Sequence, residues 1–286
     1  MAFSLGILAA IVSFFAWGVA DFLTRGIVMR MGPLRSLFWV QLFGILALLP
    51  LLLIFPVSFP SGGITFALIL LAGVLEATGT FAFYRAFAIG KVSIVAPVVG
   101  SASAVTVILG LLILGEALSP LQAAAVALLI VGIALASFDL NELRHASRRR
   151  LSAGVPEALY SMLGWGVMWF LIAFAERSAA WLFVILAIRA LTVISTAASL
   201  SLKGEGLLPE KLPWKAILPI GILDAAALAA FGFGVASEFA SLVTPIANAY
   251  PALTVLLALL ILRERPARSQ LLGILAILAG VVAISL

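Results

Sequence analysis

Ten apolar stretches, each about as long as a membrane-spanning helix, dominate this sequence. A bilayer core of about 30 Å requires about 20 apolar residues in helical form. The stretches run approximately over 3–24, 34–55, 64–88, 92–114, 120–138, 155–175, 180–202, 214–236, 241–262 and 268–286. Because helices satisfy their own backbone hydrogen bonds in lipid, the sequence predicts an all-α integral membrane protein with ten transmembrane helices.

The composition excludes several other classes of protein. Hydrophobic residues make up 64% of the chain and charged residues only 10%, whereas soluble domains are about half apolar and a quarter charged. The chain has no Cys and one His, His145, so neither a thiolate site nor a histidine cluster is available for a metal. Common catalytic motifs such as GxSxG and HExxH are absent from the sequence. We therefore expect no enzyme, no cofactor and no metal site.

The chain matches itself when it is shifted by 148 residues. Trp17-Gly18 then falls on Trp165-Gly166, and 93–116 falls on 241–264 without a gap. About a third of the positions between 73 and 138 are identical to their counterparts. The sequence therefore predicts two five-helix repeats, 1–138 and 153–286, joined by a basic linker at 139–152.

An odd number of spans per repeat requires that the second repeat be inverted in the membrane. The loops after the odd-numbered spans hold 14 of the 17 Lys and Arg residues, whereas Arg177 alone lies on the opposite side. Because Lys and Arg mark cytoplasmic loops, we expect a multi-pass protein of the cell membrane with both termini on the outer side.

The repeats resemble a known family at the fourth helix of each half, which begins near a proline and ends in glutamate. These residues are Pro97 to Gly115-Glu116 in the first repeat and Pro245 to Arg263-Glu264 in the second. Here the sequence resembles the EamA-type transporters of the drug/metabolite transporter superfamily. The resemblance implies a secondary transporter with a central cavity, lined mainly by helices 1, 3, 4, 6, 8 and 9. It also implies a small-molecule substrate, such as an amino acid or a drug, and transport in the export direction.

Ionisable residues within the spans are functional candidates, because charges are costly in lipid. Glu76 and Asp224 occupy equivalent positions near the middle of helices 3 and 8, where transporter sites form. Either carboxylate could exchange a proton during transport, or both could serve packing alone. Arg189 lies near the middle of helix 7, and the equivalent position of the first repeat is Gln41 in helix 2. The guanidinium of Arg189 requires an anion, either one of these acids or a substrate.

Polar and aromatic side chains extend this candidate cavity. Trp17 and Asp21 share one face of helix 1, and Trp165 and Trp169 share the matching face of helix 6. Such a set could hold an amphipathic or cationic metabolite by stacking and cation–π contact. Alternatively, the tryptophans anchor at lipid headgroups and Asp21 lies at the interface. The remaining candidates are the helix 3 stripe Glu76, Thr80 and Tyr84, and Ser101, Asn248 and Tyr250 in helices 4 and 9.

Pro97 and Pro245 each remove a backbone hydrogen bond within a span and are candidate hinges. Glu116 and Glu264 end helices 4 and 9, where the helix dipole does not favour a carboxylate, so we expect them to cap neighbouring helices. Ala276 and Gly280 form a small-residue step that packs the scaffold or a homodimer.

Partners and alternative functions also follow from the sequence. The basic run at 144–150 is short and indicates topology and lipid contact rather than nucleic acid binding. Protons are a possible coupling ion. The alternatives to a transporter are a scaffold or channel-like subunit and, less favoured, an intramembrane enzyme acting on a lipid-linked substrate.

Overall fold

The computed structural model describes residues 4–55, 57–60, 62–89, 95, 98–137, 154–209, 211–262 and 267–284. Within these residues the regular secondary structure is entirely helical. The elements are α1 (Leu5–Met31), α2 (Pro33–Leu48), η1 (Leu49–Leu53), α3 (Gly63–Ile89), α5 (Ala102–Leu109), η2 (Gly110–Leu114), α6 (Pro120–Ser137), α9 (Val155–Ala175), α10 (Trp181–Leu202), α11 (Trp214–Ser237), α12 (Ala240–Ala247), α13 (Tyr250–Leu262) and α14 (Arg268–Ile284).

Six helices of the described residues are long and apolar enough to cross a membrane. They are Leu5–Met31, Pro33–Leu53, Gly63–Ala86, Val155–Ala175, Trp181–Leu202 and Trp214–Ser237. Shorter apolar helices cover Val98–Leu114, Pro120–Ala136 and Arg268–Ala283, where the sequence predicts the fourth, fifth and tenth spans. The chain is therefore a multi-pass helical membrane protein.

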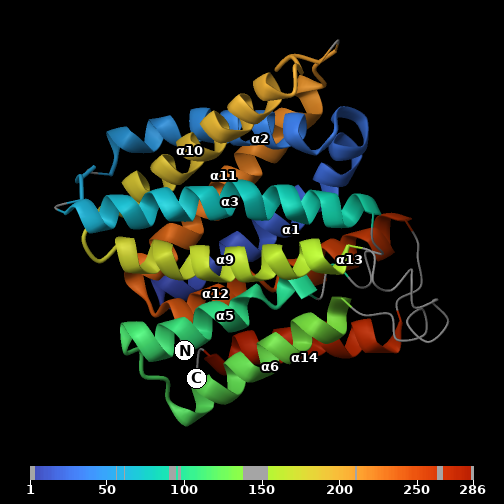
Figure 1. Cartoon of the computed structure of the whole chain (residues 1–286). Helices are drawn as coiled ribbons and strands as arrows, with labels where there is room; N and C mark the ends of the chain where they lie inside the picture. The colour runs from blue at the N-terminus through green and yellow to red at the C-terminus, as the bar shows by residue number, and fades with distance from the viewer. Residues whose placement is uncertain are drawn as a thin grey trace.

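The helices of the two sequence repeats interleave in one bundle (Figure 1). Helix α1 packs along α11, and α3 packs along α9, so each pair joins one repeat to the other. Helices α6 and α14 lie side by side at one edge of the bundle, and α2 lies against α10 at the other.

Small residues bring α6 and α14 together. A Cβ built on Gly273 would clash with the backbone of Ala136, and one on Gly280 would lie 2.8 Å from Leu129 Cγ. Gly280, one of the two small residues predicted to pack the scaffold or a homodimer, thus serves packing within the chain.

Matching hydrogen bonds relate the two repeats. Thr106 of α5 donates to the carbonyl of Gly166 in α9 (2.8 Å), and Thr254 of α13 donates to the carbonyl of Gly18 in α1 (3.1 Å). Both donors and both acceptors are 148 positions apart in the sequence. The structure therefore uses the same contact twice, once in each direction between the repeats.

The same crossings explain the glycine of each Trp-Gly pair. A Cβ on Gly18 would lie 2.7 Å from Leu253 Cδ2, and a Cβ on Gly166 would lie 2.5 Å from Val105 Cβ. Leu253 and Val105 are themselves repeat equivalents. Any larger residue at either glycine would force the crossing helices apart.

The predicted ninth span is interrupted. Helix α12 ends at Ala247, and α13 begins at Tyr250, so the helix contains a break shortly after Pro245. Backbone groups freed at such a break must be satisfied within the protein or by cavity water. The proposed hinge residue Pro245 is buried within α12, whereas Pro97 lies outside the described residues.

Glu116 caps the beginning of α12, as the sequence predicts for this residue. Its two carboxylate oxygens accept hydrogen bonds from the backbone N–H groups of Ala240 and Ser241, each at 2.9 Å. A carboxylate at a helix N-terminus interacts favourably with the helix dipole. The end of helix 4 is thereby fixed to the start of helix 9, while the equivalent residue Glu264 lies outside the described residues.

Candidate functional site

A cavity of about 60 Å³ lies in the centre of the bundle. Ten of the predicted binding residues line it, namely Trp17, Asp21, Glu76, Thr80, Tyr84, Trp165, Trp169, Arg189, Asp224 and Tyr250. Ser101 and Asn248 are not among its lining residues, and Asn248 instead donates to the carbonyl of Thr244 (3.1 Å). Seven further residues that were not predicted as binding residues also line the cavity, namely Ala20, Thr24, Val40, Gln41, Phe83, Ile220 and Leu228.

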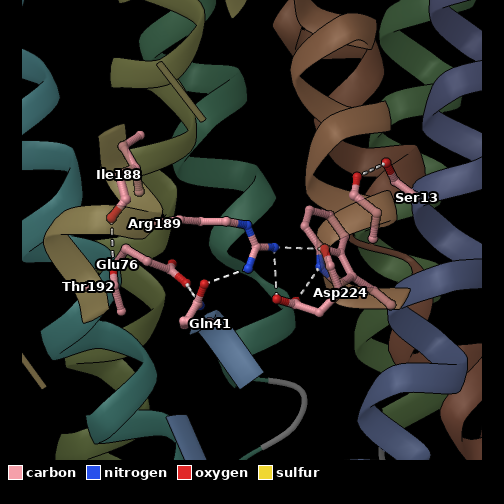
Figure 2. Close-up of polar contacts among 9 residues, drawn as sticks. Ser13, Gln41, Glu76, Ile188, Arg189, Thr192 and Asp224 are labelled. Atoms are coloured by element: carbon pink, nitrogen blue, oxygen red, sulfur yellow. Dashed lines mark hydrogen bonds and ion pairs between the residues drawn. The ribbon is translucent and has the colours of Figure 1, made fainter. Parts of the chain in front are cut away.

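A chain of polar contacts crosses this cavity from one repeat to the other (Figure 2). Arg189 donates through Nη2 to the Asp224 carboxylate (2.8 Å) and carbonyl (2.9 Å), and through Nη1 to Oε1 of Gln41. The Gln41 amide donates in turn to the Glu76 carboxylate (3.3 Å). At the other end, Trp17 Nε1 donates to Asp224 (3.1 Å). Glu76 and Asp224 are thus connected through Gln41 and Arg189, which are equivalent residues of the two repeats.

The guanidinium of Arg189 occupies a closely fitted position. The side chain is only 1% exposed, and a Cβ on Gly44 of α2 would lie 2.5 Å from its Nη1 atom. Its main anionic partner is Asp224, one of the anions considered from the sequence. Gln41 could have been recognised as a site residue, because it is polar within an apolar helix and aligns with Arg189.

Aromatic rings close the cavity at one end. The ring centroids of Trp17 and Trp169 lie 5.1 Å apart, and Phe231 lies 4.5 Å from Trp169 and 5.9 Å from Trp17. Tyr250 lies 5.9 Å from Trp17 and interacts with the Asp21 carboxylate. These rings bury large apolar surfaces in the middle of the bundle. Phe231 has no polar atom that would have marked it in the sequence.

The cavity extends away from this aromatic layer. Among its lining residues, Thr24, Tyr84 and Ile220 lie beyond the layer, toward the helix ends at Met31, Ile89 and Trp214. The loops after the odd-numbered spans, which hold most of the Lys and Arg residues, lie at the same end of the bundle. Three acidic side chains, Asp21, Glu76 and Asp224, line the cavity together with the single guanidinium of Arg189.

A second cavity, of about 330 Å³, lies at the opposite end of the bundle. Its lining includes Glu116, Glu176, Arg177 and Glu238. Arg177 donates to the carbonyl of Leu114 (3.0 Å), and Glu238 accepts a hydrogen bond from Ser4 (2.9 Å).

Glu176 lies directly after α9, and its carboxylate points into the protein beside Gly232. A Cβ on Gly232 would lie 3.2 Å from its Oε1 atom and 2.9 Å from Ile185 Cγ1. Both carboxylate oxygens are buried and have no hydrogen-bond partner within the described part of the chain. Burial raises the pKa of Glu176 well above its usual range. The described residues contain no group of three His, Cys, Asp or Glu side chains that could hold a metal ion.

Comparison with known proteins supports the repeat architecture. No curated protein matches the chain. A solved structure, titled only as the crystal structure of a protein, has the same fold, with a TM-score of 0.78 at 16% sequence identity. The similarity covers 99% of this chain and 96% of the other. The EamA-like transporter family matches twice, over residues 4–138 and 152–286. The chain therefore belongs to the EamA-like transporter family.

Proposed function

We propose that this protein is a secondary transporter that moves small organic metabolites by alternating access through the central cavity. The observation that carries the proposal is the polar chain Glu76–Gln41–Arg189–Asp224, which joins equivalent positions of the two repeats within the membrane-spanning helices. Ionisable residues at such a depth are costly unless they serve transport or are paired.

The size of the cavity supports a mechanism that requires helix movement. Cavities that hold drug-sized ligands measure about 300–1,000 Å³, whereas this one measures about 60 Å³. Binding a metabolite therefore requires that the repeats separate. The proposed ten-span topology, with repeats 1–138 and 153–286 inverted about the cavity, supplies that movement, and Pro97 and Pro245 are its proposed hinges.

The chemistry of the lining favours substrates that carry an amino group. Three carboxylates and several aromatic rings face one guanidinium, which is already paired with Asp224. Aromatic faces and carboxylates bind ammonium groups, whereas a multiply phosphorylated compound would find one guanidinium, already paired with Asp224, among three acidic side chains. Amino acids and amine-containing drugs are the proposed classes. Export across the cell membrane, with both termini outside, completes the proposal.

Glu76 is the proposed proton carrier. The Asp224 carboxylate is paired with the guanidinium of Arg189 at 2.8 Å, so protonating Asp224 would leave a buried cation without its partner. Glu76 instead accepts a hydrogen bond from the neutral amide of Gln41 at 3.3 Å. Glu76 can therefore gain or lose a proton without breaking an ion pair.

Transport into proteoliposomes tests this proposal. Radiolabelled amino acids and amines are offered with and without a pH gradient to the wild type, to Glu76→Gln and to the matched control Glu157→Gln. Glu157 pairs with Arg85 (3.3 Å) outside the central cavity. We expect E76Q to lose uphill transport while retaining substrate exchange, and E157Q to behave as the wild type.

Two results would contradict the proposal. Uphill transport by E76Q at the wild-type rate would remove Glu76 as the proton carrier. Flux that does not saturate and follows the electrochemical gradient alone would favour a channel-like subunit instead.

A further inference from the structure

Two helix interfaces are equivalent under the repeat alignment, yet they make different hydrogen bonds. In the interface between α1 and α11, Ser13 donates to the carbonyl of Ala227 (2.7 Å), and Trp17 donates to Asp224 (3.1 Å) (Figure 2). Both donors belong to the first repeat, and both acceptors belong to the second.

The equivalent interface lies between α9 and α3. The repeat alignment places Ser161 and Trp165 at the donor positions, and Gly79 and Glu76 at the acceptor positions. The Ser161 hydroxyl and Trp165 Nε1 are buried, and neither has a hydrogen-bond partner within the residues that the structure describes. Trp165 Nε1 would lie 3.1 Å from a Cβ on Gly79, and is therefore close to the helical turn that carries Glu76.

The difference does not arise from the loss of a donor or an acceptor. Both interfaces have serine and tryptophan donors, a backbone carbonyl and a carboxylate at matching positions. Elsewhere the pseudo-symmetry persists, because Thr106 and Thr254 make equivalent hydrogen bonds across the repeats. The crossings of α5 with α9 and of α13 with α1 thus remain equivalent, whereas the α1–α11 and α3–α9 interfaces differ in their hydrogen bonds.

We infer that Trp17 with Asp224 and Trp165 with Glu76 form alternating pairs, each made in one of the two orientations of the transporter. This inference rests on the proposed alternating access. When inverted repeats exchange their conformations, the α9–α3 interface adopts the present geometry of α1–α11. Trp165 then donates to Glu76 and Ser161 to the carbonyl of Gly79, while Trp17 and Ser13 release their partners.

The exchange also links the switch to the proposed proton carrier. The hydrogen bond from an indole N–H to a charged carboxylate is stronger than the one to a protonated carboxylic acid. The indole of Trp165 would thus contact Glu76 in the orientation in which Glu76 has lost its proton. Trp165 would be a positioning residue for the coupling step.

A labelling experiment can report both orientations, since the chain contains no cysteine of its own. Thr24 lines the cavity beyond the aromatic layer, and its repeat equivalent Ile172 is fully buried on α9. The variants Thr24→Cys and Ile172→Cys are reconstituted separately in nanodiscs, which expose both faces. Their rates of reaction with a water-soluble maleimide measure the populations of the two orientations.

The two tryptophans provide a matched pair of perturbations. Trp17→Phe removes a hydrogen bond of the present orientation, so it should lower labelling at T24C and raise it at I172C. Trp165→Phe should shift both in the opposite sense. We expect changes of about tenfold, as for a hydrogen bond to a charged group. Shifts in the same direction, or no shift for W165F, would overturn the inference.

Ser13→Ala and Ser161→Ala repeat the test with less disturbance of packing. They should change labelling in opposite directions by about fivefold, the effect of one neutral hydrogen bond. If I172C does not react at all in the otherwise unmodified protein, alternating access itself fails. If both cysteines react but the paired variants do not act oppositely, only the alternating pairs are refuted.

Discussion

Replacing Arg189 by Gln, the residue at the equivalent position of the first repeat, tests the energetics of the central polar chain. The change removes the guanidinium that contacts Asp224 at 2.8 Å, with the arginine side chain 1% and the aspartate side chain 23% exposed. Loss of one partner from a buried ion pair costs about 3–5 kcal/mol. Asp224 remains partly exposed to solvent and keeps the hydrogen bond from Trp17 (3.1 Å). We therefore expect the unfolding free energy to fall by about 3 kcal/mol, at the lower end of this range.

A double-mutant cycle isolates the ion pair from other effects of the substitution. The double variant R189Q/D224N no longer buries an unpaired carboxylate, so it should recover about 2 kcal/mol relative to R189Q alone. Unfolding in detergent micelles, followed by circular dichroism, measures each free energy. Arg85→Gln is the control, because the Arg85 side chain is 59% exposed where it pairs with Glu157, so this pair should contribute less than about 1 kcal/mol.

The cycle has a clear refuting result. If R189Q and D224N are each nearly neutral and their effects are additive, the guanidinium does not stabilise the centre of the bundle. The polar chain would then not couple the two repeats energetically, and the observation that carries the proposed function would lose its weight.

Three further predictions concern other parts of the molecule. Glu116→Ala removes the cap of α12 at Ala240 and should lower the unfolding free energy by about 1–2 kcal/mol, whereas Glu116→Asp should lose less in the same assay. Gly166→Ala places a Cβ 2.5 Å from Val105 and should cost about 1–3 kcal/mol, measured by thermal unfolding; an unchanged midpoint would contradict the close helix crossing. Glu176 has a raised pKa in the folded protein, so stability should fall as pH rises above about 4.5, the ordinary value for the group. Glu176→Gln should make this fall smaller, so that an unchanged wild-type pH dependence in the variant, measured between pH 5 and 8, would refute the assignment.

Much of this architecture follows from the sequence, because residues that align between the two repeats occupy equivalent places in the bundle. Trp17-Gly18 and Trp165-Gly166 are matched by sequence alone, and the structure shows each glycine at an equivalent helix crossing. Glu76 and Asp224 are found in the same way, since acids are rare within apolar helices.

Other features depend on contacts between helices, which neither the apolar stretches nor the repeat alignment could predict. The sequence offered several anions for Arg189, and only the packing of α10 between α2 and α11 shows that Asp224 and Gln41 are its partners. Phe231 is one of many apolar residues in its helix, so its position in the aromatic layer could not be distinguished. Asn248 directly follows the end of α12 at Ala247, but the apolar residues on both sides made 241–262 look like one continuous span.

The principal helix packings also bear on how such a chain arose. Helix α1 pairs with α11 and α3 with α9, so each half of the chain buries its largest surfaces against the other half. A surface that fits an inverted copy of itself is the interface of a twofold-symmetric dimer. A gene encoding one half could therefore have produced an antiparallel homodimer before the two copies were fused. Halves expressed as separate polypeptides, cut within 139–152, should still assemble in the membrane, since the covalent connection is not what holds them together.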